Sequence, residues 1–236
     1  MVAPAPAGSR MTRVASPPAT PALVLQYPLR GSFRARNSPA RRVPSHGTHL
    51  MGTTYAIDLI PVDAHGRSAP PSWRSVLATE APQAFVGFGA PVLAPTAGTV
   101  VITHDGEEDH PARRSQLSLL PYALSQGSRL RAGPAAIAGN HVVIAVGDHG
   151  PYVLLAHLRS GSIRVQTDDQ VDAGEVLAHC GNSGNSTQPH VHLQATDSTR
   201  WSSARGLPIA FDGRDGPTLP EESEIVRASG PGAPSG

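Results

Sequence analysis

Two histidines separated by one residue are the strongest candidates for chemistry in this sequence. His190 and His192 follow the turn-rich residues 181–186 (GNSGNS) and lie in a run that is typical of a β-strand. Side chains at i and i+2 of a strand point to the same face, so the two imidazoles would stand side by side. One could bind a metal ion while the other faces whatever that ion binds. Two surface histidines on an exposed strand are the alternative.

Three further side chains could complete a metal site with this pair. Asp58 lies in the apolar residues 55–60, where a carboxylate is rarely buried without a cation beside it. His157 ends the apolar residues 152–158, and the third candidate is either His46 or His49, both of which precede Asp58 in a glycine-containing stretch. Histidines and one carboxylate match a catalytic zinc site, which has three protein ligands and an open position for water. Taken singly, each could be an ordinary strand-end or loop residue.

The composition excludes several other chemistries. All 19 cationic residues of the 236-residue chain are arginines, which rules out a Schiff-base lysine, a Walker-type lysine and the attachment lysine of biotin or lipoyl carriers. The single cysteine, Cys180, excludes an intrachain disulfide and a multi-cysteine zinc site. A net charge of +1 predicts no nucleic-acid partner, and no apolar run approaches the roughly 18–20 residues that span a bilayer.

Short β-type runs between glycine, proline and asparagine turns must position these side chains. No segment shows a long helical period, and 24 glycines and 24 prolines argue against a helical bundle. The sequence therefore predicts an all-β fold, an antiparallel β-sandwich or open barrel of short strands with long loops. The expected strands are residues 55–60, 91–93, 98–103, 141–146, 152–158, 162–165, 175–178 and 190–195.

Both ends of the chain and one internal stretch depart from this pattern. Residues 1–22 predict a disordered lead-in and residues 213–236 a flexible C-terminal tail, which leaves 23–212 as the folded domain. Residues 104–139 are rich in charge and poor in β-formers, so we expect an insertion over one end of the sheet. No signal peptide is evident in residues 1–30.

Five stretches of the chain resemble, in order, the core of the lysostaphin/LytM-type zinc metallopeptidases. The last of them, which ends in the HxH pair, is the most specific. The resemblance covers about residues 43–196, and residues 104–139 have no counterpart in the compact members of the family. The five stretches are residues 90–101 (APVLAPTAGTVV), 139–144 (GNHVVI), 152–158 (YVLLAHL), 171–177 (VDAGEVL) and 180–192 (CGNSGNSTQPHVH).

The resemblance implies a role for each candidate in turn. In the family, the aspartate of the first motif and the second histidine of HxH bind zinc, so Asp58 and His192 resemble metal ligands. The first histidine of HxH and the histidine of the Ala-His-Leu strand assist the reaction. His190 and His157 therefore resemble the catalytic pair.

The third metal ligand departs from the common family pattern. The usual first motif has its histidine four residues before the aspartate, where this sequence has Thr54. A divergent branch of the family has that histidine in an upstream loop, about a dozen residues before the aspartate. His46 resembles that ligand, and His49 is the alternative.

The same resemblance implies a zinc-dependent endopeptidase that cleaves peptide stems or cross-bridges of bacterial peptidoglycan. We expect residues 66–88 and 104–139 to wall its substrate groove, and Gln194, on the face of His190 and His192, to orient a ligand. The substrate implies the extracellular or cell-wall side, although no signal peptide is visible. We expect a monomer. The histidines outside the site, at positions 65, 104, 110, 141, 149 and 179, are predicted to be loop or surface residues.

Two other classes of function compete with this hypothesis. One is a degenerate, non-catalytic LytM-like module that binds or activates a partner, and Thr54 is the feature in its favour. The other is a sugar-phosphotransferase carrier that relays a phosphoryl group between two facing histidines without a metal. A carboxylate such as Asp58 argues against the carrier because it would repel phosphate.

Overall fold

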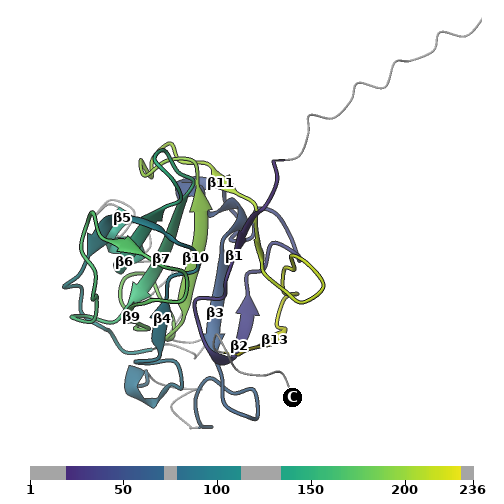
Figure 1. Ribbon diagram of the computed structural model, residues 1–236. Coiled ribbons are helices and arrows are strands. Elements are labelled where there is room, and N and C mark those ends of the chain that lie inside the picture. The colour runs from purple at the N-terminus through teal and green to yellow at the C-terminus, as the bar shows by residue number, and fades with distance from the viewer. Residues whose placement is uncertain (1–19, 72–78, 113–133, 230–236) are drawn as a thin grey trace, which may run out of the picture.

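One large, strongly bent sheet forms the body of the computed structural model, which describes residues 20–71, 79–112 and 134–229 (Figure 1). Along this sheet the strand order is β13-β2-β3-β10-β7-β6-β5-β8, and β11 adds to the end of β10. All neighbours in it are antiparallel. The strands are β2 (Gly31–Arg36), β3 (Ile57–Pro61), β5 (Gly98–His104), β6 (Asn140–Ala145), β7 (Tyr152–Leu158), β8 (Gln170–Val171), β10 (Val191–Thr196), β11 (Gly206–Leu207) and β13 (Ile225–Ala228).

Two small sheets close one side of the large sheet and bury the main core against it. They pair β4 (Pro91–Leu93) with β9 (Val176–His179), antiparallel, and β1 (Leu23–Leu25) with β12 (Ile209–Phe211), parallel. Alternate residues of β10, namely Val191, Leu193 and Ala195, point into this core. Residues 192, 194 and 196 therefore lie on the opposite face of the sheet, as the period of two requires.

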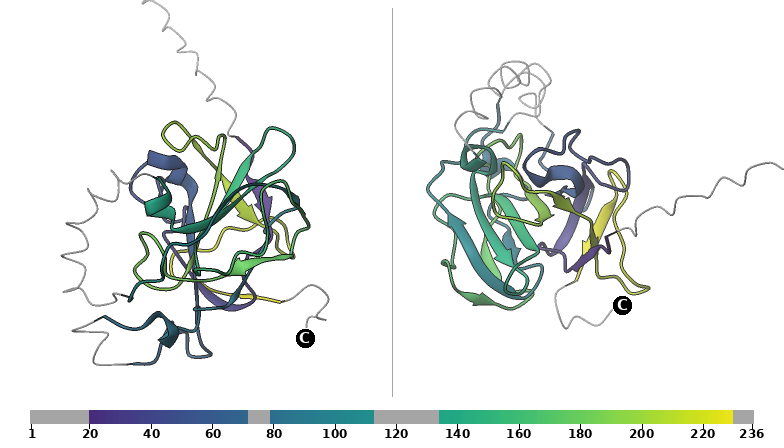
Figure 2. Two further views of the ribbon diagram at one scale, coloured as in Figure 1. Left: turned by 90° about the vertical axis from the view of Figure 1, so that its left-hand side faces the viewer. Right: turned by 90° about the horizontal axis from the view of Figure 1, so that it is seen from above.

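Three short helices complete the described fold. They are η1 (Leu50–Tyr55), η2 (Pro82–Ala84) and α3 (Pro134–Ala138). Figure 2 shows η1 and α3 near one another on the same face of the sheet. No helix of the described residues has the length and apolar character needed to cross a membrane.

The predicted all-β fold is confirmed, with differences in detail. Residues 91–93 and 152–158 are strands with the expected limits, whereas 162–165 form no strand. The run 55–60 begins later, because Tyr55 ends η1. The strands β1, β2, β8, β11, β12 and β13 were not predicted, since they are short or lack clear alternation.

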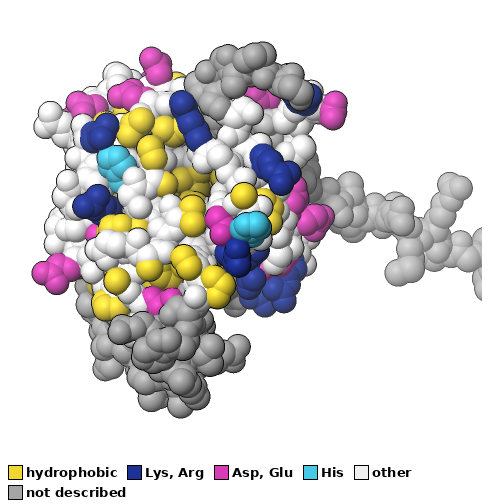
Figure 3. Space-filling view, turned by 90° about the horizontal axis from the view of Figure 1, so that it is seen from below, with side chains coloured by type: hydrophobic (Ala, Val, Ile, Leu, Met, Phe, Trp, Pro, Cys, Tyr) yellow, Lys and Arg dark blue, Asp and Glu magenta, His cyan; other side chains and the backbone are white. Residues whose placement is uncertain are grey.

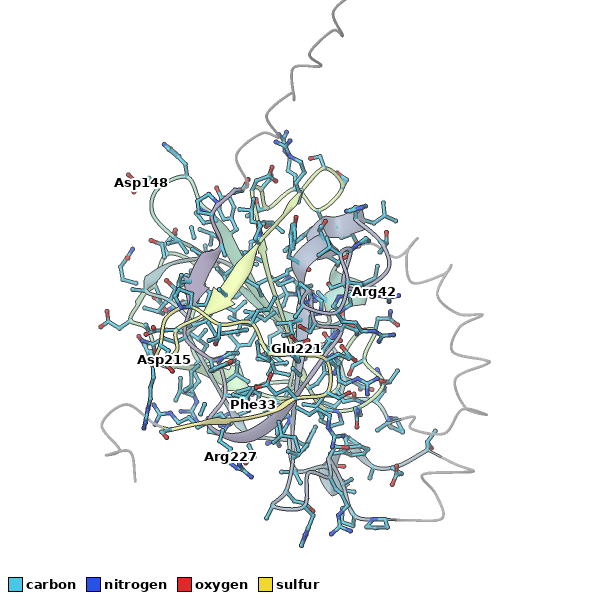
Figure 4. All side chains as sticks on the ribbon, turned by 90° about the vertical axis from the view of Figure 1, so that its right-hand side faces the viewer. Phe33, Arg42, Asp148, Asp215, Glu221 and Arg227 are labelled. Atoms are coloured by element: carbon cyan, nitrogen blue, oxygen red, sulfur yellow. The ribbon has the colours of Figure 1, made fainter. Side chains whose placement is uncertain are left out.

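The C-terminal stretch differs from the tail that the sequence predicts. β13 lies within residues 213–236 and pairs with β2 in antiparallel register, with Val226 opposite Phe33. Figure 4 labels Phe33 and Arg227 at this edge of the sheet. Glycine, proline and acidic residues around β13 hide a strand of only four residues from composition-based reasoning. The domain limits stay a prediction, and residues 1–19 and 230–236 lie outside the described part.

The surface carries charges of both signs. On the face seen from below, acidic and basic side chains surround hydrophobic ones (Figure 3). This mixture is in keeping with the net charge of +1. Of the expected insertion 104–139, residues 104–112 and 134–139 are described, and the remainder lies outside the described residues.

Candidate metal centre

Three neighbouring strands place the candidate side chains in one row across the outer face of the sheet. Asp58 of β3 is the direct cross-strand partner of His192 of β10, which in turn lies opposite Ala156 of β7. Directly opposite residues have Cβ atoms about 4.5–5.5 Å apart. His190 lies on the same face as His192, as the spacing predicts. The register therefore brings together groups that are 134 residues apart in the chain.

His157 reaches this face through a local break in strand alternation. Val153, Leu155 and Leu158 point into the main core, whereas Leu154 and Ala156 point outward. Strict alternation would bury residue 157 with Val153 and Leu155. Its φ of 63° is instead left-handed, which is uncommon for a residue other than glycine and costs about 1–2 kcal/mol. This turn rotates the imidazole to the outer face, where it lines the same cavity as His190 and His192.

His46 arrives from the loop before η1 and completes a cluster with Asp58 and His192. One candidate ligand atom from each of the three residues lies within 4.8 Å of the other two. His46 Nε2 is 3.3 Å from Asp58 Oδ1, and His192 Nδ1 is 2.9 Å from the same oxygen. His49 is not part of this cluster: its exposed ring pairs with Thr54 Oγ1 at 3.1 Å.

Hydrogen bonds fix which nitrogen of His192 carries the proton. Gln194 Nε2 donates to the carbonyl of Met51 at 2.9 Å, so Gln194 Oε1 faces His192 Nε2 at 3.0 Å. Oε1 can only accept, and His192 Nε2 must therefore be the N–H. The lone pair of His192 Nδ1 then points at Asp58. Gln194 thus orients His192, as we expected from its position on the strand.

The same logic applies to His46. Ser45 Oγ donates to the carbonyl of Thr53 at 3.1 Å, which leaves it free to accept from His46 Nδ1 at 3.0 Å. His46 Nε2 therefore bears a lone pair, and it faces the carboxylate of Asp58. A buried carboxylate surrounded by lone pairs requires a positive charge between them, either a proton or a metal ion.

Hydrogen bonds also fix the tautomers of His190 and His157. His190 Nδ1 donates to the carbonyl of Gln188 at 2.8 Å, and His157 Nδ1 donates to the carbonyl of Ser183 at 3.0 Å. Each ring therefore keeps its Nε2 lone pair for the cavity. His190 Nε2 is 3.6 Å from Asp58 Oδ1, whereas the His157 ring packs against the His190 ring with centroids 4.7 Å apart.

Burial and charge shift the pKa values of these groups in opposite directions. Burial alone would raise the pKa of Asp58, but in the metal-free protein, where protonated histidines face it, the charge of His190 and hydrogen bonds from the histidines hold that pKa well below its usual value. Burial opposes the charged form of His190, and the neighbouring Asp58 outweighs it and raises the pKa of His190. For His157, burial and then the nearby His190 and His192 hold the pKa well below the usual value.

The donor set fits zinc. Imidazole nitrogens and one carboxylate oxygen are the ligands that zinc takes, and its four tetrahedral ligands lie about 3.4 Å apart at bond lengths near 2.1 Å. The oxygen–nitrogen distances of 2.9 and 3.3 Å around Asp58 Oδ1 are close to that spacing. Asn37 Nδ2 donates to the other oxygen, Oδ2, at 2.7 Å, and His46 Nε2 lies 3.3 Å from each of the two oxygens.

Sequence reasoning missed several residues of this site. Asn37 follows β2 with a left-handed φ of 51°, and no motif pointed to it. Trp201 and Leu154 line the cavity, but single apolar residues carry no such information. Of the two expected walls, residues 104–139 contribute Ile137 and Ala138, whereas none of the described residues of 66–88 is among the lining residues.

His141 corrects the expectation that the histidines outside the site are loop or surface residues. It is only 4% exposed and lies on β6. Its Nδ1 donates to the carbonyl of Gly139 at 2.7 Å, and its ring stacks on that of His104. Because its N–H is hydrogen-bonded and its ring is stacked, the neutral imidazole can be buried at little cost. The position of His141 at the start of a predicted strand did not indicate this burial.

Comparison with known proteins agrees with the predicted resemblance. The family model described as Peptidase family M23 matches residues 122–203, which include His157, His190 and His192. Among solved structures, the chain is similar to the catalytic domain of the antimicrobial peptidase lysostaphin from Staphylococcus simulans, with 18% identity over 64% of this chain and 74% of that chain and a TM-score of 0.37. It is also similar to the catalytic domain of a mutant of the prophage-encoded M23 protein EnpA from Enterococcus faecalis, with 20% identity over 65% and 73% of the two chains and a TM-score of 0.36. The family match supports a peptidase.

Proposed function

We propose, from the match of residues 122–203 to peptidase family M23 and from the lone pairs that converge on Asp58, that this protein is a zinc-dependent endopeptidase of bacterial peptidoglycan. The observation that carries the proposal is the arrangement of imidazoles around one buried carboxylate, each with its N–H held elsewhere. Such an arrangement is unfavourable for the protein alone and favourable around a cation.

His46, Asp58 and His192 would hold the zinc ion. When bound, zinc supplies a Lewis acid that polarises the scissile carbonyl and lowers the pKa of a water molecule. Asn37 donates to Oδ2 of Asp58 and so helps to fix the orientation of the carboxylate. Gln194 and Ser45 keep His192 and His46 in the tautomers that present lone pairs.

His157 and His190 would move the protons of the reaction. Each presents Nε2 to the cavity while a backbone carbonyl holds its Nδ1–H. One of them accepts the proton of the attacking water on Nε2, and the carbonyl stabilises the resulting imidazolium. The other, when it carries a second proton on Nε2, donates a hydrogen bond to the developing oxyanion, and the captured proton passes from the first histidine to the leaving amine, so the pair starts and ends the cycle unchanged.

Metal analysis of purified variants tests the ligand set. We expect one equivalent of zinc in the wild type and in His49→Ala, and loss of zinc in His46→Ala and His192→Ala. His49→Ala is the matched control, because it removes an imidazole three residues away whose exposed ring pairs with Thr54. Retention of zinc in His46→Ala together with its loss in His49→Ala would contradict the proposed ligand set.

Hydrolysis of peptidoglycan fragments tests the activity. We expect the wild type to release new amino termini from wall peptides, and His157→Ala and His190→Ala to retain zinc but lose most of the turnover, by at least about 100-fold. A zinc-loaded wild type that cleaves no wall peptide would contradict the peptidase and favour the binding module that Thr54 suggested.

A further inference from the structure

One wall of the candidate active-site cavity is apolar. The cavity has a volume of about 500 Å³, and Ile137 and Ala138 of α3, Leu154 and Ala156 of β7, and Trp201 line this side. We call these five residues the apolar wall. Figure 2 shows α3 beside the sheet on the face where η1 also lies.

The apolar wall is fixed by packing rather than loosely exposed. Leu154 and Ala156 form a buried cluster with Val143 on the outer face of the sheet, and Ala138 and Trp201 pack against that cluster. The Trp201 indole also meets the His141 ring edge-on, with centroids 6.3 Å apart. A surface held in this way is preorganised, so a ligand need not order it on binding.

The apolar wall adjoins the reacting groups directly. Ala156 is the cross-strand partner of His192, and Leu154 is the partner of Gln194. His157 follows Ala156 in the chain. A peptide whose scissile bond lies at the histidines must therefore place the side chain of a residue next to that bond against the apolar wall.

The cavity offers no counterion for a charged side chain. Apart from the histidines, Asp58 is the one residue with an ionisable side chain among the described lining residues, and the proposed metal would engage it. The other polar lining residues are asparagine, threonine and glutamine. Burying an unpaired ammonium or carboxylate there would cost several kcal/mol.

We propose that the cavity is specific for peptides with an uncharged aliphatic side chain, alanine or larger, on a residue that flanks the cleaved bond, and that Trp201 determines this selectivity. This inference rests on the proposed peptidase function only where its test measures cleavage, since binding to the apolar wall can be measured without it. Glycine at that position would leave the apolar wall uncovered, whereas each buried methyl or methylene group adds about 0.8 kcal/mol, or roughly fourfold in affinity.

Matched peptides that differ at one flanking position test the selectivity. Glycine, alanine, leucine and lysine are compared there, first on one side of the scissile bond and then on the other. On one of the two sides we expect kcat/KM to rise at least about fourfold from glycine to alanine, and lysine to be the poorest. Equal rates for glycine and alanine on both sides, or a preference for lysine, would overturn the proposal.

Two variants assign the selectivity to the apolar wall. Trp201→Ala and, independently, Ile137→Ala should bring the alanine-to-glycine ratio toward one. Val86→Ala is the matched control, because Val86 is 45% exposed and is not among the lining residues, and it should keep the wild-type ratio. An unchanged ratio in folded Trp201→Ala and Ile137→Ala proteins would contradict the role of the wall.

Binding measured without turnover separates this inference from the proposed function. In a Trp73→Phe background Trp201 is the only tryptophan, so its fluorescence reports directly on ligands at the apolar wall. Aliphatic peptides should shift this emission at lower concentration than glycine peptides, whether or not they are cleaved. Selective binding without cleavage would refute the peptidase and support the wall, whereas binding without selectivity would refute the wall.

Discussion

Replacing Gln194 with leucine should weaken zinc binding although Gln194 itself would not touch the metal. The amide of Gln194 bridges His192 Nε2, at 3.0 Å, and the carbonyl of Met51, at 2.9 Å. Leucine removes both hydrogen bonds. His192 is only 9% exposed, so its Nε2–H would be left unpaired at a cost of about 1–3 kcal/mol.

His192 can avoid that cost by changing tautomer. In Gln194→Leu the proton moves to Nδ1, from where it donates to Asp58 Oδ1, now 2.9 Å away. This stabilises the metal-free protein and occupies the very nitrogen that would bind zinc. Metal binding must then reverse the change, and we expect the Kd for zinc to rise about 10- to 100-fold, which is roughly 1.4–2.7 kcal/mol.

Competition with a chromophoric chelator measures the affinity, and the ¹⁵N shifts of His192 report the tautomer. Thr196→Val is the control: Thr196 lies two residues further along the same face of β10, and its hydroxyl donates to the carbonyl of Ser198 rather than to a histidine. It should change stability without changing zinc affinity more than about twofold. Wild-type affinity in Gln194→Leu, with the proton still on Nε2, would refute the reasoning.

Three further predictions concern residues outside the cluster. Glu222→Gln should weaken zinc binding roughly tenfold, as measured by chelator competition. Glu222 holds Arg36 at 3.0 Å, and without it the arginine is free to pair with Asp58, its cross-strand neighbour. The affinity should be restored in the double variant Glu222→Gln/Arg36→Gln. Gly139→Ala should lower the free energy of unfolding by about 2–4 kcal/mol, since φ is 63° and a Cβ would lie 2.6 Å from the backbone carbon of Ser183; urea unfolding indistinguishable from wild type would contradict this. Burial lowers the pKa of His141, so the unfolded chain binds a proton that the folded chain does not, and stability should fall as the pH drops below the usual histidine value of about 6.5; His141→Phe should show a smaller loss between pH 7.5 and 5.5 in the same assay.

The strongest sequence predictions were those that depend on strand geometry alone. His190 and His192 share a face because a strand has a period of two, and the structure confirms this. Asp58 in an apolar run indicated a cation nearby; its carboxylate lies among histidine nitrogens, and the cation itself stays a prediction. Both inferences follow from local sequence, since alternation and the cost of burial do not depend on the partner strand.

The sequence could not predict the features that depend on long-range strand register or on an unusual backbone conformation. The left-handed φ of His157 reverses the face of its side chain, and no propensity predicts such a conformation at histidine. Asn37 reaches Asp58 only because β2 and β3 pair in one register. β13 pairs with β2 across most of the chain, so composition alone assigned it to a tail.

The strand register that forms the core also brings Asp58 and His192 together, so the core and the candidate metal site cannot be varied separately. If β10 slipped by one residue against β3 and β7, Leu193 would point outward and His192 into the main core, because side-chain direction alternates strictly along a strand. The loss of apolar burial by Val191, Leu193 and Ala195 opposes that slip. Hydrogen bonds to Gln194, Ser45, Gln188 and Ser183 then turn each imidazole within its place. Hydrophobic burial therefore fixes the strand register, and with it the face on which the strand histidines lie. The hydrogen bonds then determine which ring nitrogen of each histidine carries a lone pair toward the cavity.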